Sequence, residues 1–326
     1  MPILCRVTRG ELTESIHVAF AVAIDETGQP FYSTGDPQYL TCIRSSLKPF
    51  QAAASVKAGA VDAAEFNDEE LALMCASHKG EKMHVKTAQS MLTKLGLTVD
   101  DYECGSHFPS DTLTRHRMIR EDKEAQPLHN NCSGKHAGML ALAKHLGQGT
   151  ANYIKKDHPV QRTILEYVQD VSGLKMIPTE IDGCSAPTPF MTLETIAGLF
   201  QTLAAGNEPE LKRVFKAMCS CPDLVGGSNH FDSNFIKALA GRGVTKVGGE
   251  SVRGIALKTQ DKGPVGIALK ILDGNFRALP VATMKLLEHL ELLTEKELQN
   301  LDKFRTKILK NHNQIEIGRI EAHVEF

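Results

Sequence analysis

Apolar and other side chains alternate near the N-terminus of the chain. One apolar set recurs at every second residue, namely Ile16, Val18, Phe20, Val22 and Ile24. This period of two is typical of a β-strand. The set is interrupted around Gly28, and the apolar character resumes at Phe31 and Tyr32. The pattern therefore predicts a β-hairpin.

The middle of the chain follows the period of an α-helix. Asn67 and Glu70 form a capping-box pattern that predicts a helix through Met74. Helical spacing recurs over five more segments, which are residues 83–95, 135–146, 159–171, 193–205 and 209–218. Glycines follow four of these segments, as is typical of helix ends.

Strand patterns return late in the sequence, at residues 243–247, 252–258, 265–272 and 276–279. Asp273-Gly274 is a strong hairpin signal between the last two. Two helices follow, one with Pro280 near its start and one capped by Thr294 with Glu297, and a strand over 315–324 ends the pattern. Strands at both ends predict an α/β, α+β-like fold with one antiparallel or mixed sheet flanked by helices. We expect a sheet-containing lobe, residues 1–60 plus 225–326, and a mainly helical lobe, residues 61–224.

Composition narrows the functional classes. The 326 residues are 42% hydrophobic and 23% charged, which is ordinary for a globular protein. The net charge of −2 gives no reason to expect nucleic acid or an anionic membrane as a partner. No apolar stretch approaches the roughly 18 residues of a membrane span. Arg6 and Arg9 make the first ten residues unlike a signal peptide, so we expect a cytoplasmic protein.

The chain contains eight cysteines. In a cytoplasmic protein these are expected to be buried thiols, metal ligands or reactive groups rather than a disulfide framework. Cys219 and Cys221 stand close together, but they fall at a predicted helix end before Pro222, and we interpret them as packing residues.

The sequence Ser45-Ser46-Leu47-Lys48 is the first candidate for catalysis. Pro49 follows at once, and proline is tolerated in the first turn of a helix. Ser45 and Lys48 are therefore expected to share one face at a helix N-terminus. A lysine that is neutral when it acts could take the proton of the hydroxyl, as in Ser–Lys acyl-transfer enzymes.

The motif is short, and the chain holds a second copy at Ser172-Gly-Leu-Lys175. In penicillin-recognising enzymes, a Ser-x-x-Lys helix start is combined with a Lys-Thr-Gly strand. Here Lys258-Thr259 ends a predicted strand, but glutamine follows instead of glycine, and a Ser-Asp-Asn element is missing. A β-lactamase-like or penicillin-binding hydrolase therefore stays an alternative.

Two polar segments contain thiols. The first runs from His129 to Met139 and holds Gly134-Lys135, but it lacks the other residues of a phosphate-binding loop, which we exclude. The second is the turn around Cys184. Cys132 and Cys184 could bind a soft or borderline cation together, with Lys135, His129 or His136 as a third ligand. A third polar segment places Ser77 and His78 in a turn after the capped helix.

Together these segments resemble the rhizobial-type, or class 3, L-asparaginases, which are related in fold to serine β-lactamases and glutaminases. The similarity rests on four strings in the order of the family: Arg44 to Gln51, Cys75 to His78, His129 to Leu140, and Asp182 to Thr188. The Lys258 strand and the sequence from Lys270 to Gly274 also match.

The resemblance implies hydrolysis of L-asparagine to L-aspartate and ammonia by a homodimer. Ser45 with Lys48 and Ser77 with Lys258 would be two Ser–Lys pairs, with Ser45 as nucleophile and Lys48 as its base. The family's zinc would fall on Cys132, Lys135 and Cys184, where it organises the pocket. The implied substrate-binding residues are Arg44 for the α-carboxylate and Asp182 for the α-amino group, together with His78, Asn131, Lys135 and His136.

Three positions depart from the family pattern. His230 stands where arginine is usual, Ser233 where threonine is usual, and Ser251 where glycine is typical. They leave the reaction class unchanged but affect expectations for affinity and turnover. A catalytically silent, zinc-binding dimeric scaffold is a further alternative. The preference for asparagine over glutamine, a difference of one methylene, is not predicted.

Overall fold

The structure is a computed structural model that describes residues 2–324. The chain forms two compact units. A sheet unit contains the residues up to Ile43, Met191–Ala205 and the residues from Ala238 onward, and a helical unit contains Arg44–Phe190 and Gly206–Lys237. The lobes expected from the sequence have other bounds, because α1 (Lys48–Lys57) lies in the helical unit and α8 (Leu193–Ala205) in the sheet unit.

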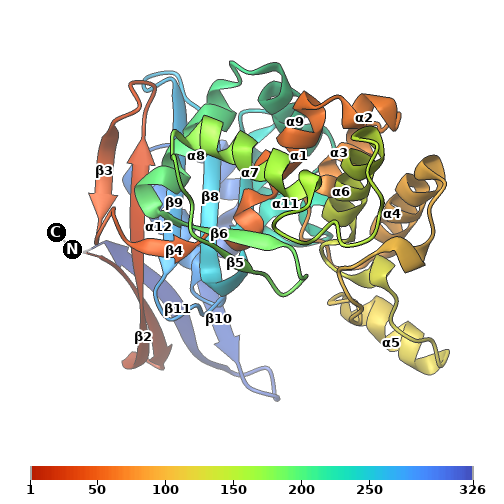
Figure 1. Cartoon of the computed structure of the whole chain (residues 1–326). Helices are drawn as coiled ribbons and strands as arrows, with labels where there is room; N and C mark the ends of the chain where they lie inside the picture. Colours follow the sequence, from red (N-terminus) through yellow and green to blue (C-terminus); the bar gives the residue numbers. More distant parts are fainter. Residues whose placement is uncertain (1, 325–326) are drawn as a thin grey trace. The chain divides into compact units, whose positions relative to one another are not determined.

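One antiparallel sheet of eight strands organises the described part of the sheet unit (Figure 1). Its order is β10-β11-β1-β2-β9-β8-β7, and β3 pairs with β2. The strands of this unit are β1 (Ile3–Arg9), β2 (Leu12–Ile24), β3 (Pro30–Thr34), β4 (Leu40–Cys42), β7 (Gly243–Gly248), β8 (Val252–Lys258), β9 (Pro264–Ile271), β10 (Lys307–Lys310) and β11 (Glu316–Val324). Since β1 pairs with both β2 and β11, the predicted sheet built from the two ends of the chain is confirmed.

Two helices cover opposite faces of this sheet. Helix α8 packs so closely on β8 and β9 that a Cβ on Gly266 would lie 2.0 Å from the Ala197 oxygen. Helix α12 (Leu279–His289) places Val281 against Val7 and Ile320 on the other face. The unit also contains α13 (Glu295–Asn300) and the 3-10 helices η4 (Gly249–Ser251) and η5 (Asp302–Phe304).

The predicted hairpin is confirmed as β2 and β3, but over residues 16–19 of β2 the buried side chains are not those of the apolar set. His17 and Ala19 are buried, whereas Ile16 is 53% exposed and Val18 is half-buried. Alternation therefore predicted the strand correctly, although the apolar set is not uniformly its buried face. The period of the hydrophobic pattern identifies a strand, whereas packing against neighbouring strands and helices determines which face of the strand is buried.

The helical unit is built around α6, whose residues are buried on all sides from Ser133 to Ala143. Helix α1 packs on α6, α7 and α9, and α3 packs on α4, α6 and α9. The helices here are α1, α2 (Ala60–Ala63), α3 (Asp68–Met74), α4 (Lys82–Leu95), α5 (Thr112–Arg120), α6 (Ser133–His145), α7 (Pro159–Ser172), α9 (Pro209–Ser220), α10 (Pro222–Gly226) and α11 (Phe231–Leu239). Three short 3-10 helices, η1 (Arg44–Leu47), η2 (Val99–Asp101) and η3 (Pro127–His129), and the hairpin of β5 (Thr179–Ile181) with β6 (Pro187–Thr192) connect them.

The predicted strand over 276–279 is wrong. Asp273-Gly274 lies in the turn after β9, and the chain continues through a second turn at 276–278 into α12 instead of forming a hairpin. Pro280 in the first turn favours this helix start. Strands β1 and β10 and helix α5 had not been predicted. Each is short, and none carries a long periodic pattern.

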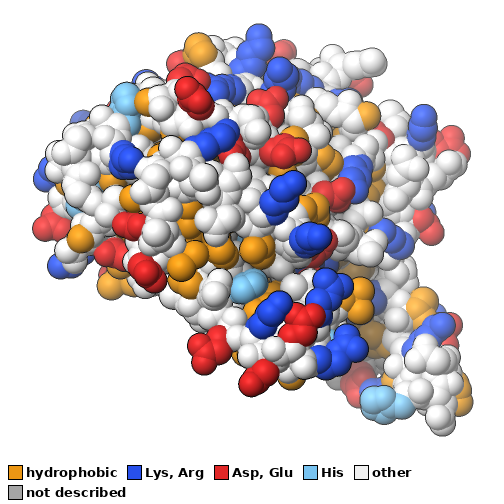
Figure 2. Space-filling view, turned by 90° about the vertical axis from the view of Figure 1, so that its right-hand side faces the viewer, with side chains coloured by type: hydrophobic (Ala, Val, Ile, Leu, Met, Phe, Trp, Pro, Cys, Tyr) orange, Lys and Arg blue, Asp and Glu red, His pale blue; other side chains and the backbone are white. Residues whose placement is uncertain are grey.

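The surface gives little sign of a strongly charged partner. On the face drawn in Figure 2, basic and acidic side chains are interspersed over the whole visible area. None of the helices that the structure describes has the length and apolarity needed to cross a membrane.

Candidate active site

Helix α1 begins at the Ser-x-x-Lys sequence, as predicted. The 3-10 helix η1 leads directly into α1, and Pro49 occupies the first turn, where a missing N–H removes no intrahelical bond. Ser45 is half-buried, and Lys48 is only 1% exposed. The arrangement places a buried lysine beside a partly accessible helix start.

The Lys48 amine donates its hydrogen bonds to other parts of the helical unit. Lys48 Nζ lies 3.2 Å from Ser77 Oγ and 3.3 Å from the Asn131 carbonyl oxygen, and it also donates to the Ala76 carbonyl oxygen. Among the described residues, no hydrogen bond joins Lys48 to Ser45. The structure thus brings Lys48 to Ser77, and the role of Lys48 as the base of Ser45 stays a prediction.

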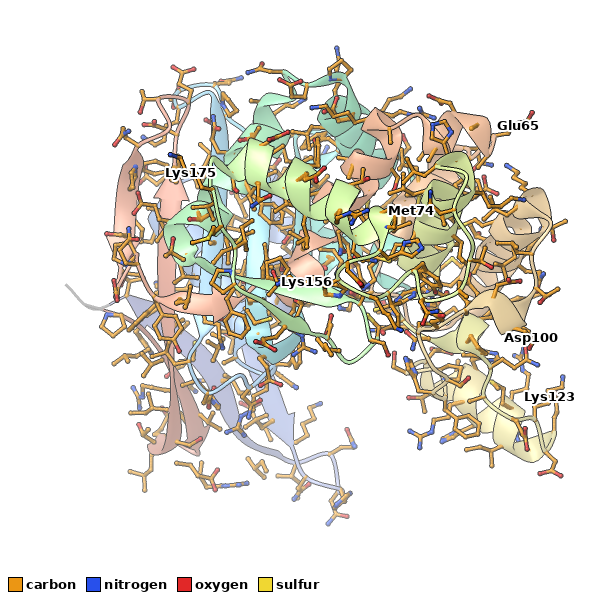
Figure 3. All side chains as sticks on the ribbon, in the orientation of Figure 1. Glu65, Met74, Asp100, Lys123, Lys156 and Lys175 are labelled. Atoms are coloured by element: carbon orange, nitrogen blue, oxygen red, sulfur yellow. The ribbon has the colours of Figure 1, made fainter. Side chains whose placement is uncertain are left out.

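Two neighbouring segments hold Ser77 in place. Helix α3 has the predicted Asn67–Glu70 capping box and ends at Met74, which Figure 3 labels. Three residues later, the Ser77 N–H donates to the Val225 carbonyl oxygen of α10 at 3.0 Å. The Ser77 side chain is half-buried.

His78 is buried in a neutral, defined tautomer. Its Nδ1 accepts the Gly80 N–H at 3.1 Å, so Nε2 carries the proton and donates to Ser133 Oγ at 2.8 Å. The ring stacks on His84 with 4.9 Å between centroids. Burial, together with nearby His84 and Lys48, holds the pKa of His78 well below its ordinary value. His78 therefore acts here as an uncharged hydrogen-bond donor.

The two predicted thiols and Lys135 meet at the start of α6. Lys135 Nζ donates to Cys184 Sγ at 2.8 Å. The hydrogen bond from Cys132 and the Lys135 ammonium lower the pKa of Cys184, and the same hydrogen bond raises the pKa of Cys132. Burial opposes the charge on Lys135, but the two sulfurs outweigh it, so the pKa of Lys135 is raised. The cluster therefore favours a thiolate at Cys184 over one at Cys132, beside a charged Lys135.

The donor types of this cluster suit zinc. Thiolates are preferred zinc ligands, and a second nitrogen, His136 Nε2, is buried beside Cys184. No group of three or more His, Cys, Asp or Glu side chains suited to a metal occurs in the described part of the chain. A zinc ion here would therefore require Lys135 as a ligand, and Lys135 would first have to lose its proton.

Arg44 and Asp182, the residues expected to bind the α-carboxylate and the α-amino group, form an ion pair with each other. Arg44 Nε lies 2.8 Å from Asp182 Oδ1, with Asp182 only 10% exposed. The pair uses Nε of the guanidinium, which leaves its two terminal nitrogens directed elsewhere. Their roles in binding a substrate stay predictions.

Lys258 lies in the sheet unit, at the end of β8, and is exposed. Two other lysines of the same sheet are buried, Lys246 on β7 and Lys270 on β9. Lys270 donates to the Glu250 carbonyl oxygen at 2.6 Å, and burial lowers its pKa. The burial of Lys246 was not predicted, because a single lysine in a short strand gives no indication that its side chain is buried.

The three departures from the family pattern have distinct surroundings. Ser251 has a φ of 56°, a left-handed conformation that favours glycine, and its Oγ donates to the Gly274 carbonyl oxygen at 2.9 Å. Ser233 Oγ is buried without a hydrogen-bond partner among the described residues. His230 Nδ1 accepts the Asp232 N–H at 3.2 Å.

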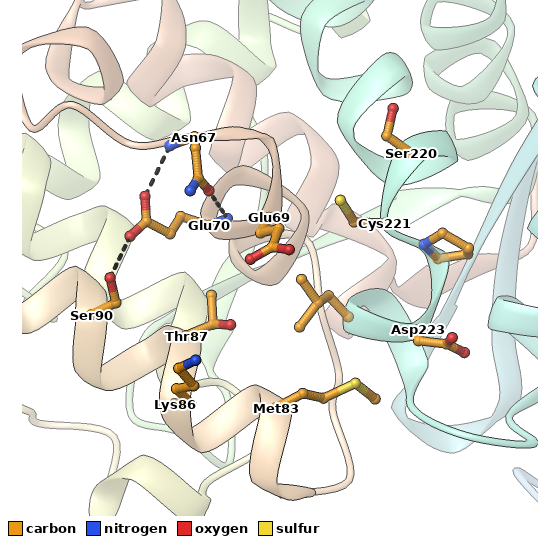
Figure 4. A pocket seen from close by; sticks show the side chains of 12 residues that line it. Asn67, Glu69, Glu70, Met83, Lys86, Thr87, Ser90, Ser220, Cys221 and Asp223 are labelled. Carbon is orange, nitrogen blue, oxygen red and sulfur yellow. Dashed lines mark hydrogen bonds between the residues drawn. The ribbon is translucent and has the colours of Figure 1, made fainter.

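A cavity of about 480 Å³ lies elsewhere in the helical unit, between α3, α4 and the start of α10 (Figure 4). Its walls include Glu69, Lys86 and Cys221. None of the site residues predicted from the sequence lines this cavity. The candidate site is therefore defined by its hydrogen bonds and not by this cavity.

Comparison with known proteins identifies a family. A family model described as L-asparaginase II matches residues 5–322. No match was found among curated proteins.

The chain is also similar to solved structures, all at low identity. They include a beta-lactamase from Burkholderia ambifaria (13% identity, 78% of this chain and 84% of that chain, TM-score 0.39) and a beta-lactamase from Sphaerobacter thermophilus (11%, 89% and 88%, 0.39). A third is Mglu in its native form in 4.3 M NaCl (14%, 84% and 61%, 0.39), so the chain spans about three fifths of that protein. At these TM-scores the likeness carries no conclusion about this chain.

Proposed function

Because the chain belongs to the L-asparaginase II family, we propose that it hydrolyses L-asparagine to L-aspartate and ammonia through an acyl-enzyme on a serine. The observation that carries this mechanism is the buried Lys48 amine, 3.2 Å from Ser77 Oγ. A lysine beside a serine hydroxyl is the arrangement that activates the nucleophile in Ser–Lys enzymes.

In the proposed reaction, Ser45 Oγ attacks the side-chain carbonyl carbon of asparagine. Its proton passes through Ser77 to a neutral Lys48 amine, which then protonates the leaving nitrogen as the C–N bond breaks. Water then adds to the acyl carbon of the resulting ester and gives a proton to Lys48. The bond between that carbon and Ser45 Oγ breaks, the proton returns to Oγ, and aspartate leaves. If Ser77 itself carries the acyl group, the directly bonded Lys48 is its base.

Recognition of the substrate falls to the Arg44–Asp182 pair in this proposal. The guanidinium would receive the α-carboxylate, and the Asp182 carboxylate would receive the α-ammonium group. Asparagine carries both groups, as do other α-amino acids, so the pair favours a free amino acid over an internal peptide amide.

The test is ammonia release from L-asparagine by the wild type and by three matched serine variants. Ser45→Ala and Ser77→Ala are expected to lower kcat by at least about 10²-fold, because each removes a hydroxyl of the proposed relay. Ser172→Ala, in the second Ser-x-x-Lys sequence, should leave kcat unchanged. Full activity in both Ser45→Ala and Ser77→Ala would contradict the mechanism.

The acylated serine can be identified directly. A diazoketone analogue of asparagine alkylates an activated serine, and peptide mass spectrometry locates the label. Label on Ser45 supports the relay through Ser77, whereas label on Ser77 assigns Lys48 as its direct base. Absence of both labels in an active enzyme would exclude a serine nucleophile at either position.

We further propose that Cys132, Lys135 and Cys184 hold a zinc ion. The metal would supply a positive charge that neutralises the Cys184 thiolate and fixes the loops around it. Elemental analysis should find about one zinc per chain in the wild type and little in Cys184→Ser. Cys221→Ser is the matched control and should keep the metal. Equal zinc in all three proteins would remove the assignment.

A further inference from the structure

Residues 104–111 hold both loops that surround the Lys48 amine. The Asp111 N–H donates to the Lys79 carbonyl oxygen at 3.0 Å, two residues after Ser77. On the other side, the Asn131 N–H donates to His107 Nε2 at 3.1 Å, and Asn130 Nδ2 donates to the Cys104 carbonyl oxygen at 2.8 Å. This segment therefore connects the Ser77 loop with the Asn131 loop.

Asn131 is the residue through which this segment reaches Lys48. The Asn131 carbonyl oxygen accepts Lys48 Nζ at 3.3 Å and the His78 N–H, also at 3.3 Å. The two peptide planes of Asn131 are fixed separately, since His107 accepts its N–H and Asn130 Oδ1 accepts the Cys132 N–H at 2.8 Å. Loss of the His107 bond would free the plane that precedes the Asn131 Cα, and the carbonyl plane on the other side of that Cα would lose one of its two restraints.

The hydrogen bonds of His107 define its tautomer. Nδ1 lies 2.8 Å from the Phe108 carbonyl oxygen and donates to it, so Nε2 is free of hydrogen and accepts the Asn131 N–H. The ring is exposed to solvent. An exposed histidine that accepts a backbone N–H beside the Lys48 amine is placed to orient that backbone.

We propose that His107 is a positioning residue that keeps the Asn131 carbonyl oxygen directed at the Lys48 amine. Its kinetic effect rests on the proposed function, whereas its structural effect does not. Neither the sequence motifs nor the family resemblance includes His107, because it lies between the matched strings.

The kinetic experiment compares His107→Ala and His107→Gln with His116→Ala, an exposed histidine on α5. His107→Ala should lower kcat about 10-fold and change KM by less, because it misplaces the Asn131 carbonyl oxygen that accepts the Lys48 amine. The glutamine amide oxygen can replace Nε2 as acceptor, so His107→Gln should recover most of kcat. His116→Ala should match the wild type.

A second readout does not need activity. Hydrogen exchange of the Asn131 amide should be slow in the wild type and in His107→Gln and at least about 10-fold faster in His107→Ala. Unchanged exchange and unchanged kcat in His107→Ala would overturn the proposal. If the wild type releases no ammonia, the proposed function fails, and the exchange data alone decide the role of His107. Should His107→Ala not fold, His107→Gln still decides, because loss of Asn131 protection there contradicts the acceptor role.

Discussion

Two regions of the helical unit carry the same Ser-x-x-Lys sequence in opposite settings. Ser45 and Lys48 stand at the beginning of α1, and Lys48 is buried among three oxygen acceptors. Ser172 and Lys175 stand at the end of α7, where Ser172 Oγ bonds the Gln169 carbonyl oxygen at 3.3 Å and Lys175, labelled in Figure 3, is exposed. The pattern of letters is identical, but the physical surroundings differ.

The difference shows which surroundings a Ser-x-x-Lys sequence needs before it can act in catalysis. At a helix start, free N–H groups and the positive end of the dipole favour a developing negative charge on oxygen. At a helix end the dipole has the other sign, and an exposed amine stays charged and hydrated. The two sequences have the same residue spacing. They differ in their position in the helix and in the burial of the lysine.

Removing each lysine in turn tests most directly whether the two Ser-x-x-Lys sequences differ in function. Lys48→Met should lower kcat by about 10³-fold or more, because it deletes the buried amine that lies 3.2 Å from Ser77 Oγ. Lys175→Met should leave kcat within about twofold of the wild type. Steady-state ammonia release from asparagine measures both.

Two controls accompany the lysine variants. Lys48→Arg keeps a cation but cannot give up its proton, so it should be as inactive as Lys48→Met. Thermal unfolding of all variants shows whether a loss reflects misfolding, since Lys48→Met also removes the lysine donor of the buried Ala76 carbonyl oxygen. An active, folded Lys48→Met protein would end the distinction between the two sequences.

The sequence predicted the elements that carry long or capped patterns. The helix over 193–205 and the strand over 252–258 have the predicted bounds, and the capping boxes of α3 and α13 are present. The strand predicted at 276–279 failed because Pro280 and the turn before it start a helix, which a four-residue apolar pattern does not reveal.

The sequence predicted which residues belong to the candidate site, but it did not predict which of them form hydrogen bonds with one another. Motifs located Lys48, Ser77, Cys132 and Cys184, whereas the bond from Lys48 to Ser77 joins residues 29 positions apart. His107 was not predicted, because its proposed role depends on a single hydrogen bond that its ring accepts from the Asn131 N–H. Such partners depend on tertiary packing, which local patterns do not encode.

Low pH should lower the free energy of unfolding through two buried histidines near Ser77, which have no counterpart among the described residues of the second Ser-x-x-Lys sequence. The pKa of His78 is lowered by burial and then by His84, Lys48, His107 and His129, and burial also lowers the pKa of His84. In the unfolded chain both rings take up a proton near pH 6.5, so the native state loses stability as the pH falls below about 6.5. We expect the free energy of unfolding to fall by about 1–3 kcal/mol between pH 7.5 and 5.5.

Urea unfolding at several pH values measures this loss. His84→Gln removes one of the two titrating rings and should flatten the pH dependence between 7.5 and 5.5, even if the variant is less stable at pH 7.5. Ser172→Ala, in the second sequence, removes no titrating ring and should leave the slope unchanged. A wild-type protein equally stable at both pH values would show that neither ring is held neutral by the fold.

The smallest expected effect concerns the glycine inside the second sequence. Gly173 ends α7 with a φ of 72°, and a Cβ there would meet nothing within 4 Å. Gly173→Ala therefore costs only the left-handed backbone, about 1 kcal/mol of unfolding free energy, and kcat should not change. Gly173→Asn should cost less, because asparagine tolerates this conformation. A fall in kcat without a fall in stability would mean that the second Ser-x-x-Lys sequence contributes to catalysis after all, and helix position would no longer distinguish the two.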